Sequence, residues 1–240
     1  MTAVASAILG LFSFSLPKTP PSKSDNKGIS ISDILGLDAL SLLKDRNFLM
    51  FFVASVLICI PLAFYYQYTN LFLVDMGMPN PTGKMALGQV SEALFLLLLP
   101  VFFKRFGFKK TLLVGMAAWA IRYTLFAYGD AGELTFMLLI GIALHGICYD
   151  FFFVSGQIYT DFKAGEKVKS AAQGMITLAT YGVGMLIGFW VAGKIFDLYT
   201  AGDTNDWNQI WLLPAGFAVG VLILFFVIFK DEKVALNEAK

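Results

Sequence analysis

Apolar stretches separated by short polar loops run through most of the chain. Six of them approach or exceed the roughly 20 residues that a helix needs to cross the hydrocarbon core of a bilayer. They lie near residues 48–74, 85–103, 111–128, 134–160, 171–198 and 210–229. A further apolar stretch, 1–16, is short for a full span and is interpreted as the end of a longer helix. The pattern predicts an all-α integral membrane protein with six transmembrane helices plus a partial N-terminal helix.

The composition fits this class of protein. Hydrophobic residues make up 58% of the chain and charged residues 15%, whereas soluble domains carry about a quarter charged residues. The net charge of +1 gives no reason to expect a nucleic-acid partner. Cys59 and Cys148 lie inside apolar runs without metal-ligand spacing, and His145 is the single histidine. We therefore predict no metal site and no cofactor.

Basic and non-basic loops alternate along the chain. Before the first span and after the second, fourth and sixth spans the loops are basic, and the loops between them are acidic or lack a basic residue within them. The basic positions are Lys18, Lys23, Lys27, Lys44, Arg46, Lys104, Arg105, Lys109, Lys110, Lys163, Lys167, Lys169, Lys230, Lys233 and Lys240. The positive-inside rule then places these loops and the C-terminus in the cytoplasm, for a multi-pass protein of a cytoplasmic membrane.

Four regions follow from this topology. Residues 1–16 are the partial transmembrane helix, 48–230 the six-helix transmembrane domain and 231–240 a cytoplasmic tail. Residues 17–47 are predicted to be a cytoplasmic linker, first rich in Pro, Ser and Lys. Its second part carries Ile31, Ile34, Leu35, Leu42 and Leu43 at near-helical spacing, which predicts an amphipathic helix on the membrane surface or on the bundle.

Two spans carry pairs of polar side chains at helical spacing. Gln67 and Asn70 share a face of the first span, where unpaired amides are costly in hydrocarbon. Either these two side chains form hydrogen bonds between helices, or they belong to an aromatic-lined ligand site. Gln89 and Glu92 share a face of the leucine-rich second span. An acid in such a helix is costly, so we favour a functional Glu92 that binds a polar ligand, carries a proton or pairs with a buried cation.

The fourth span holds a second acid. Asp150 lies on one helical stripe with Val154, Gln157 and Asp161, and a functional role is expected for Asp150 but a solvated or loop-pairing role for Asp161. His145 shares a face with Tyr149, not with Asp150, and is expected to be a hydrogen-bonded core residue.

Two further features of the spans lead to packing predictions. Arg122, near the outer end of the third span, is expected to extend to the lipid headgroups. Gly184 and Gly188 form a small-xxx-small pair for close helix packing. The chain has no nucleotide-binding glycine loop, HExxH or nucleophile elbow, so we predict that it is not an enzyme.

Several strings resemble a known family. Lys104-Arg-Phe-Gly-Phe-Lys-Lys110 resembles the basic loop of the major facilitator superfamily, in its second-half copy, although Lys104 stands where that loop usually has an acid. More specifically, four strings are similar to the bacterial nucleoside:proton symporter family. These are Phe64-Tyr-Tyr-Gln-Tyr-Thr-Asn70, Gly88-Gln-Val-Ser-Glu92, Leu144-His-Gly-Ile-Cys-Tyr-Asp-Phe-Phe-Phe153 and Thr180-Tyr-Gly-Val-Gly-Met185. Leu16-Pro-Lys-Thr-Pro-Pro21 is similar to the end of that family's sixth helix.

The resemblance implies the C-terminal half of a twelve-helix transporter, beginning within helix six. It implies proton-coupled nucleoside transport across the bacterial cytoplasmic membrane by alternating access, with nucleoside and proton as partners and the other wall of the cavity in a missing N-terminal half. The implied substrate contacts are Gln67, Asn70, Gln89, Glu92, Tyr149 and Asp150, and the implied proton-coupling acids are Glu92 and Asp150. Two alternatives stay open: a transporter half for another polar solute such as a sugar, and a non-transporting membrane interaction protein.

Overall fold

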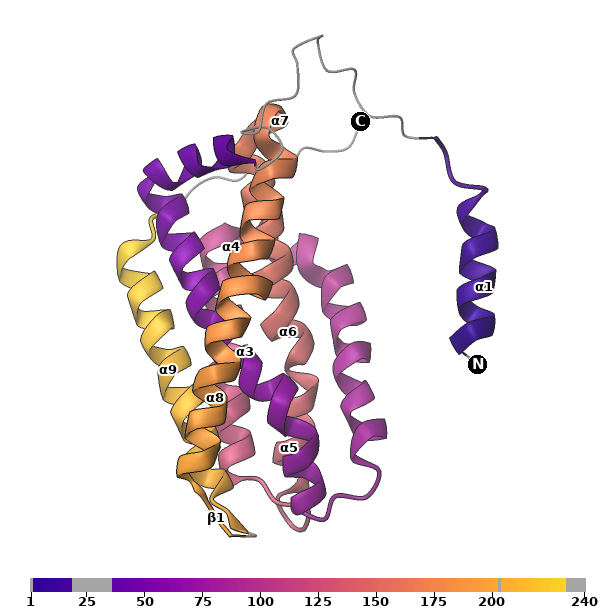
Figure 1. Cartoon of the computed structure of the whole chain (residues 1–240), viewed down its shortest axis with the longest axis vertical. Coiled ribbons are helices and arrows are strands. Elements are labelled where there is room, and N and C mark those ends of the chain that lie inside the picture. Colours follow the sequence, from indigo (N-terminus) through magenta and orange to yellow (C-terminus); the bar gives the residue numbers. More distant parts are fainter. Residues whose placement is uncertain (1, 19–35, 203, 232–240) are drawn as a thin grey trace. The chain divides into compact units, whose positions relative to one another are not determined.

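The computed structural model describes residues 2–18, 36–202 and 204–231. The chain divides into two compact units, Met1–Ile34 and Leu35–Lys240. The first unit contains helix α1 (Thr2–Ser13). The second contains a helical bundle and a short hairpin of two strands of two residues each, and its elements are drawn in Figure 1. They are η1 (Leu37–Lys44), α3 (Arg46–Asp75), α4 (Pro81–Tyr128), α5 (Thr135–Ala143), α6 (His145–Tyr149), η2 (Asp150–Val154), α7 (Ser155–Thr177), η3 (Leu178–Gly184), α8 (Met185–Leu198), β1 (Thr200–Ala201), β2 (Thr204–Asn205) and α9 (Trp207–Ile228).

Among the described residues, four continuous helical stretches are long and apolar enough to cross a membrane: Arg46–Asp75, Pro81–Tyr128, Thr135–Leu198 and Trp207–Ile228. Two of them are interrupted by a glycine with positive φ, Gly107 (φ 77°, ψ 176°) in α4 and Gly165 (φ 61°, ψ −178°) in α7. Glycine is the residue that adopts this conformation without a steric penalty, so the chain turns there. Within the described residues the bundle therefore has six arms, and the two glycines fall in predicted loops.

Side-chain contacts hold the basic loops at one end of the bundle. Asn47 Nδ2 donates to the Lys230 carbonyl at 3.0 Å, and Lys109 Nζ donates to the Phe226 carbonyl at the end of α9 at 2.9 Å. Lys163 Nζ lies 2.9 Å from Asp45 Oδ2. The turn of α7 lies at this end and β1 lies at the other (Figure 1). Within the described residues of the bundle, the structure thus gathers the basic loops at one end, as the alternating charge pattern predicted.

Asp45 begins α3 at this end. Its carboxylate accepts a hydrogen bond from the Phe48 amide at 2.9 Å and so caps the helix. Partial burial opposes ionisation of Asp45, but the hydrogen bonds from Lys163 and Phe48 outweigh it, and the pKa of this carboxyl lies below its ordinary value.

The opposite end is held by a second acid. Asp75 Oδ2, at the end of α3, accepts hydrogen bonds from Asn205 Nδ2 at 2.7 Å and from Trp207 Nε1 at 3.1 Å. Asn208 Nδ2 donates to the Ala127 carbonyl at 2.9 Å and joins α9 to α4. Both ends of the bundle are therefore fixed by polar contacts between elements distant in sequence.

Aromatic rings fill the interior between these ends. Trp211 of α9 stacks on Tyr123 of α4 with ring centroids 5.5 Å apart, and Phe72 of α3 packs against the same indole at 5.4 Å. Nearer the basic end, Phe108 of α4 stacks on Tyr159 of α7 at 4.4 Å. The many phenylalanines thus serve as the packing residues of the bundle.

The predicted glycine packing is confirmed. A Cβ atom on Gly184 would lie 2.8 Å from Cys59 Cβ, and one on Gly188 would lie 2.7 Å from Ala63 Cβ and 2.8 Å from the Cys59 carbonyl oxygen. These distances are shorter than van der Waals contact, so the close approach of α3 to η3 and α8 requires glycine at both positions.

Only the second half of the predicted amphipathic helix falls within the described residues. Ile31, Ile34 and Leu35 lie outside the described residues, and the described part is the 3₁₀ helix η1. Leu42 and Leu43 are half-buried and pack against the apolar core, and η1 contacts α7 and α3. Of the two locations that the sequence left open, η1 lies on the bundle.

Candidate functional site

Ser91 of α4 supports a break between α5 and α6. Its Oγ donates to the Ala143 carbonyl and accepts from the Gly146 amide at 3.2 Å, on either side of Leu144. A Cβ on Gly146 would lie 2.5 Å from the Ser91 carbonyl oxygen and 2.6 Å from the Glu92 nitrogen. The glycine therefore brings α6 directly against the turn of α4 that carries Glu92.

A row of ionisable side chains starts from this contact. Arg122 Nη1 lies 3.0 Å from His145 Nδ1, and His145 Nε2 lies 3.7 Å from Glu92 Oε2. Arg122 and His145 are buried, whereas the Glu92 side chain is 37% exposed. The row runs from the interior of the bundle to its surface.

The prediction that Arg122 extends to the headgroups is wrong. The residue is 0% exposed, and its guanidinium lies 3.5 Å from the centroid of the Tyr65 ring. It also packs near Trp119 and Phe126 at 5.7 and 5.6 Å. Arg122 is only six residues, or roughly 9 Å, from the end of α4, but its side chain points toward α3 and α6. Arg122 therefore interacts with aromatic rings and with His145 instead of with lipid headgroups.

The expectation that His145 is a hydrogen-bonded core residue is confirmed. His145 is a buried, hydrogen-bonded residue, and its ring stacks on Tyr65 with centroids 5.1 Å apart. Tyr149 shares its face, with centroids 5.8 Å apart, as the helical spacing predicted. The sequence did not indicate that His145 connects Arg122 to Glu92.

Asp150 occupies a helix irregularity and leaves its predicted stripe. Residues 150–154 are π-helical, with the Ser155 amide donating to the Asp150 carbonyl five residues earlier. Val154, Gln157 and Asp161 still share one pocket, but Asp150 is rotated into the interior and is 1% exposed. Neither carboxylate oxygen has a hydrogen-bond partner among the described residues, and Asp150 and Glu92 lie close enough to interact electrostatically. π-bulges of this kind are frequent at functional sites.

Tyrosines surround the exposed side of this group. Tyr149 Oη and Tyr181 Oη are hydrogen-bonded, which joins α6 to η3. Tyr66 of α3 lies near Tyr149 and Glu92, and it is 50% exposed. The structure therefore brings Glu92, Tyr149 and Asp150 together, and adds Tyr66 and Tyr181, which the sequence analysis did not select.

The three predicted amide contacts are less closely joined to this group. Gln67, Asn70 and Gln89 are all exposed. Gln67 Nε2 donates to the Tyr68 hydroxyl at 3.0 Å, and Asn70 Nδ2 donates to Thr82 Oγ1 at 3.2 Å. Asn70 thus links α3 to α4, as the helix-to-helix interpretation allowed, and both amides lie on an accessible surface, as the ligand-site interpretation requires.

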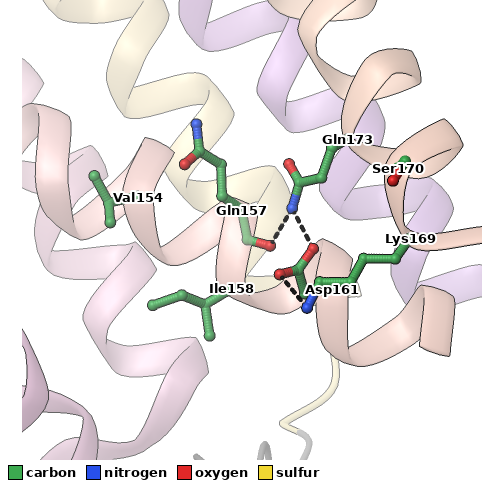
Figure 2. Close-up of a pocket in the computed structure, with 7 residues that line it drawn as sticks. All are labelled: Val154, Gln157, Ile158, Asp161, Lys169, Ser170 and Gln173. Atoms are coloured by element: carbon green, nitrogen blue, oxygen red, sulfur yellow. Dashed lines mark hydrogen bonds and ion pairs between the residues drawn. The ribbon is translucent and has the colours of Figure 1, made fainter. Parts of the chain in front are cut away.

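Asp161 lies in a pocket at the basic end, shown in Figure 2. Its carboxylate accepts from Gln173 Nε2 at 2.6 Å and lies 3.1 Å from Lys169 Nζ, across the turn at Gly165. This is the loop-pairing role that was predicted. The pocket has a volume of about 570 Å³ and is lined by Val154, Gln157, Ile158, Asp161, Lys169, Ser170 and Gln173.

Several residues of the site gave little sequence signal. Ser91 and Gly146 are small residues whose importance depends on the neighbouring helix, and Tyr65 and Tyr66 lie in an aromatic run with no marked position. Arg122 was the one detectable signal, because a cation six residues from a helix end can face inward as well as outward.

Comparison with known proteins gives this geometry a family context. The family model described as Nucleoside H+ symporter matches residues 1–234. The putative nucleoside transporter YegT of Escherichia coli K12 is 46% identical over 100% of the chain, and the nucleoside permease NupG of the same organism is 33% identical over 97%. The chain spans 58% of the length of each of these relatives.

A solved structure agrees with these sequence relatives. The crystal structure of a mutant of the nucleoside transporter NupG superimposes with a TM-score of 0.79 at 33% identity, over 95% of this chain and 59% of that one. The helical arms described above are therefore arranged as in a solved transporter, and the multi-pass membrane architecture is shared. On the match over residues 1–234, the relatives and this structural agreement, the chain belongs to the nucleoside H+ symporter family.

Proposed function

We propose that this chain takes part in proton-coupled nucleoside transport by alternating access across a bacterial cytoplasmic membrane. The family match over residues 1–234 is the observation that carries the proposal. Support from the geometry is the surface that combines Glu92 with tyrosines and amides, since aromatic faces with a few hydrogen-bonding groups suit a flat polar molecule such as a nucleoside. The C-terminus and the basic loops lie on the cytoplasmic side in this proposal, following the positive-inside rule.

The proposed substrate contacts are Gln67, Asn70, Gln89, Glu92, Tyr149 and Asp150. Glu92 and Asp150 are the proposed proton carriers, because an acid inside a membrane bundle must exchange a proton or find a partner to be tolerated. Glu92 is accessible, whereas Asp150 is buried near it. We assign proton entry to Glu92. Asp150 then responds to the charge of Glu92 through their electrostatic interaction.

The chain works with a complementary set of helices in this proposal. Gln67, Asn70 and Gln89 are exposed on the bundle at positions within membrane-crossing arms. The amide nitrogens of Gln67 and Asn70 have partners within the bundle, but in contact with lipid the remaining polar atoms of the three amides would lack hydrogen bonds, so another protein surface or a water-filled cavity must cover them. Alternating access also needs two repeats that move around a shared midplane site. The isolated chain is therefore expected not to transport.

The test replaces the matching segment of YegT with this chain and measures uptake of labelled uridine and adenosine in proteoliposomes at several pH values. The chimera is expected to give pH-dependent uptake, and the chain reconstituted alone is expected to give none. Glu92→Gln or Asp150→Asn should remove the pH dependence, whereas Asp161→Asn, which changes a paired acid at the basic end, should preserve it. If both inner variants kept the parent's pH-dependent uptake, the proton-coupling assignment would be wrong, and uptake of neither nucleoside would contradict the substrate class.

A further inference from the structure

The buried part of the row, Arg122 and His145, is not explained by substrate contact. Arg122 is fully buried and His145 is 4% exposed, so neither is accessible to a ligand on the surface that carries Glu92. Arg122 Nε and Nη2 have no hydrogen-bond partner among the described residues. A buried cation with so few partners is costly, and such a residue is retained where it has a task.

The contact between Arg122 and His145 has a defined direction. A guanidinium has only donors, so at 3.0 Å from Arg122 Nη1 the His145 Nδ1 atom must accept the hydrogen bond. In the neutral imidazole the proton is then on Nε2, which is the ring nitrogen that faces Glu92. A second proton on Nδ1 would remove this hydrogen bond and place a cation beside Arg122. The arginine therefore selects one neutral tautomer.

The His145 ring is held by Tyr65, by Arg122 and by the α4 backbone at Gly88. Tyr65 carries both groups on its ring, with the His145 centroid at 5.1 Å and the Arg122 guanidinium carbon at 3.5 Å. On the α4 side a Cβ at Gly88 would lie 3.3 Å from His145 Cβ, so this glycine allows the close approach. Glu92, in contrast, has a half-exposed side chain, and its oxygen at 3.7 Å is slightly beyond hydrogen-bonding distance. A small rotation of Glu92 closes this gap while the donor stays in place.

We propose that Arg122 and His145 are positioning residues for Glu92. Arg122 holds His145 as its Nε2–H tautomer, and His145 Nε2–H donates a hydrogen bond to the ionised Glu92. The link to proton coupling rests on the proposed function, whereas the tautomer and the contact do not. Two further titratable groups interact electrostatically with Glu92, Asp150 of η2 and Tyr66 of α3. Cys148 and Tyr65 lie beside Arg122.

The single histidine makes the tautomer directly measurable. The 240-residue chain is labelled with ¹⁵N-histidine, placed in lipid nanodiscs, and its ring nitrogens are assigned by two-bond ¹⁵N–¹H couplings. We expect one neutral ring with the proton on Nε2 throughout about pH 5 to 8, where a free histidine would titrate. Arg122→Met should release the ring to titrate and to populate both tautomers, and Arg122→Lys should restore the Nε2–H form. If His145 of the unsubstituted chain is protonated on Nδ1, or is charged at neutral pH, the proposal is overturned. This measurement does not depend on any variant folding.

The contact with Glu92 has its own readout. Glu92→Ala should move the Nε2–H proton resonance upfield because the acceptor is lost, while Glu133→Gln, an exposed acid outside the arms, should leave it unchanged. An unchanged resonance in Glu92→Ala overturns the proposed donation. In the YegT chimera, His145→Phe keeps the ring on Tyr65 but removes the donor, so the pH profile of uptake should shift to higher pH by about one unit. An unshifted profile overturns the link to coupling. Absence of all uptake by the parent chimera, with the expected tautomer present, would contradict the proposed function instead.

Discussion

Gly146→Ala tests the closest helix contact of the site. The added Cβ would lie 2.5 Å from the carbonyl carbon and oxygen of Ser91 and 2.6 Å from the Glu92 nitrogen. All three neighbours are backbone atoms, so no side-chain rotation can relieve the overlap. Van der Waals contact needs at least about 3.5 Å, and α6 and α4 must therefore separate by roughly 1 Å.

The expected cost follows from two opposing effects. Overpacking destabilises by about 1–3 kcal/mol, and an overlap with three backbone atoms belongs at the upper end of that range, about 2–3 kcal/mol, while alanine recovers about 1 kcal/mol over glycine in a helix. The net loss of about 1–2 kcal/mol corresponds to a fall in Tm of about 2–8 °C for a chain of this size. Separation of the two helices also weakens the Ser91 hydrogen bonds on both sides of Leu144.

The assay is thermal unfolding of the purified chain in detergent, followed by intrinsic fluorescence at one scan rate because unfolding of membrane proteins is often irreversible. Gly193→Ala in α8 is the matched control, since a Cβ there meets nothing within 4 Å. It should melt at the parent temperature or above. If Gly146→Ala melted as high as the parent, α6 would not lie against the Glu92 turn and the site geometry would be wrong.

Two other predictions use the same melting assay. Ser91→Ala should lower the free energy of unfolding by about 1–3 kcal/mol, because it leaves the Ala143 carbonyl and the Gly146 amide without their partner. Ser170→Ala, at an exposed position, is the control and should change stability by less than about 0.5 kcal/mol. Equal effects of the two substitutions would argue against the bridging role of Ser91. Asp45→Ala should lower stability by about 1 kcal/mol through loss of the α3 cap, while Asp45→Asn, which still caps but lacks the charge, should lower stability at pH 7 by less than Asp45→Ala does. Because the pKa of Asp45 is lowered by folding, its ionised form contributes stability above about pH 4 that is lost as the pH falls further, and this acid-dependent loss should be absent in Asp45→Asn.

The membrane architecture could be predicted from local sequence. The length of each apolar run is set by the thickness of the bilayer, and the alternation of basic loops needs no knowledge of packing. The predicted loops at 104–110 and 161–170 contain the turns at Gly107 and Gly165, and the basic loops meet at one end. Glu92 was identified for the same reason, because an acid in a leucine-rich helix stands out against its immediate neighbours.

The direction in which polar side chains point was decided by tertiary structure. Hydropathy gives the depth of a residue along a helix but not which neighbouring helix its side chain meets, so Arg122 was assigned to the headgroups although it lies on Tyr65. Helical spacing placed Asp150 on the stripe of Asp161, and the π-helical turn after it rotated the carboxylate inward.

The connection between His145 and Glu92 shows the same limit. These residues are 53 positions apart, and their approach depends on Gly146 against the Ser91 backbone and on the Ser91 hydroxyl at the break after Ala143. Sequence alone indicated that a membrane-spanning segment carries an acid, because the cost of burying a charge depends on its immediate apolar neighbours. Only the packing of α3, α4 and α6 determined which groups meet that acid, because the rotation of each helix is fixed by contacts between segments distant in sequence.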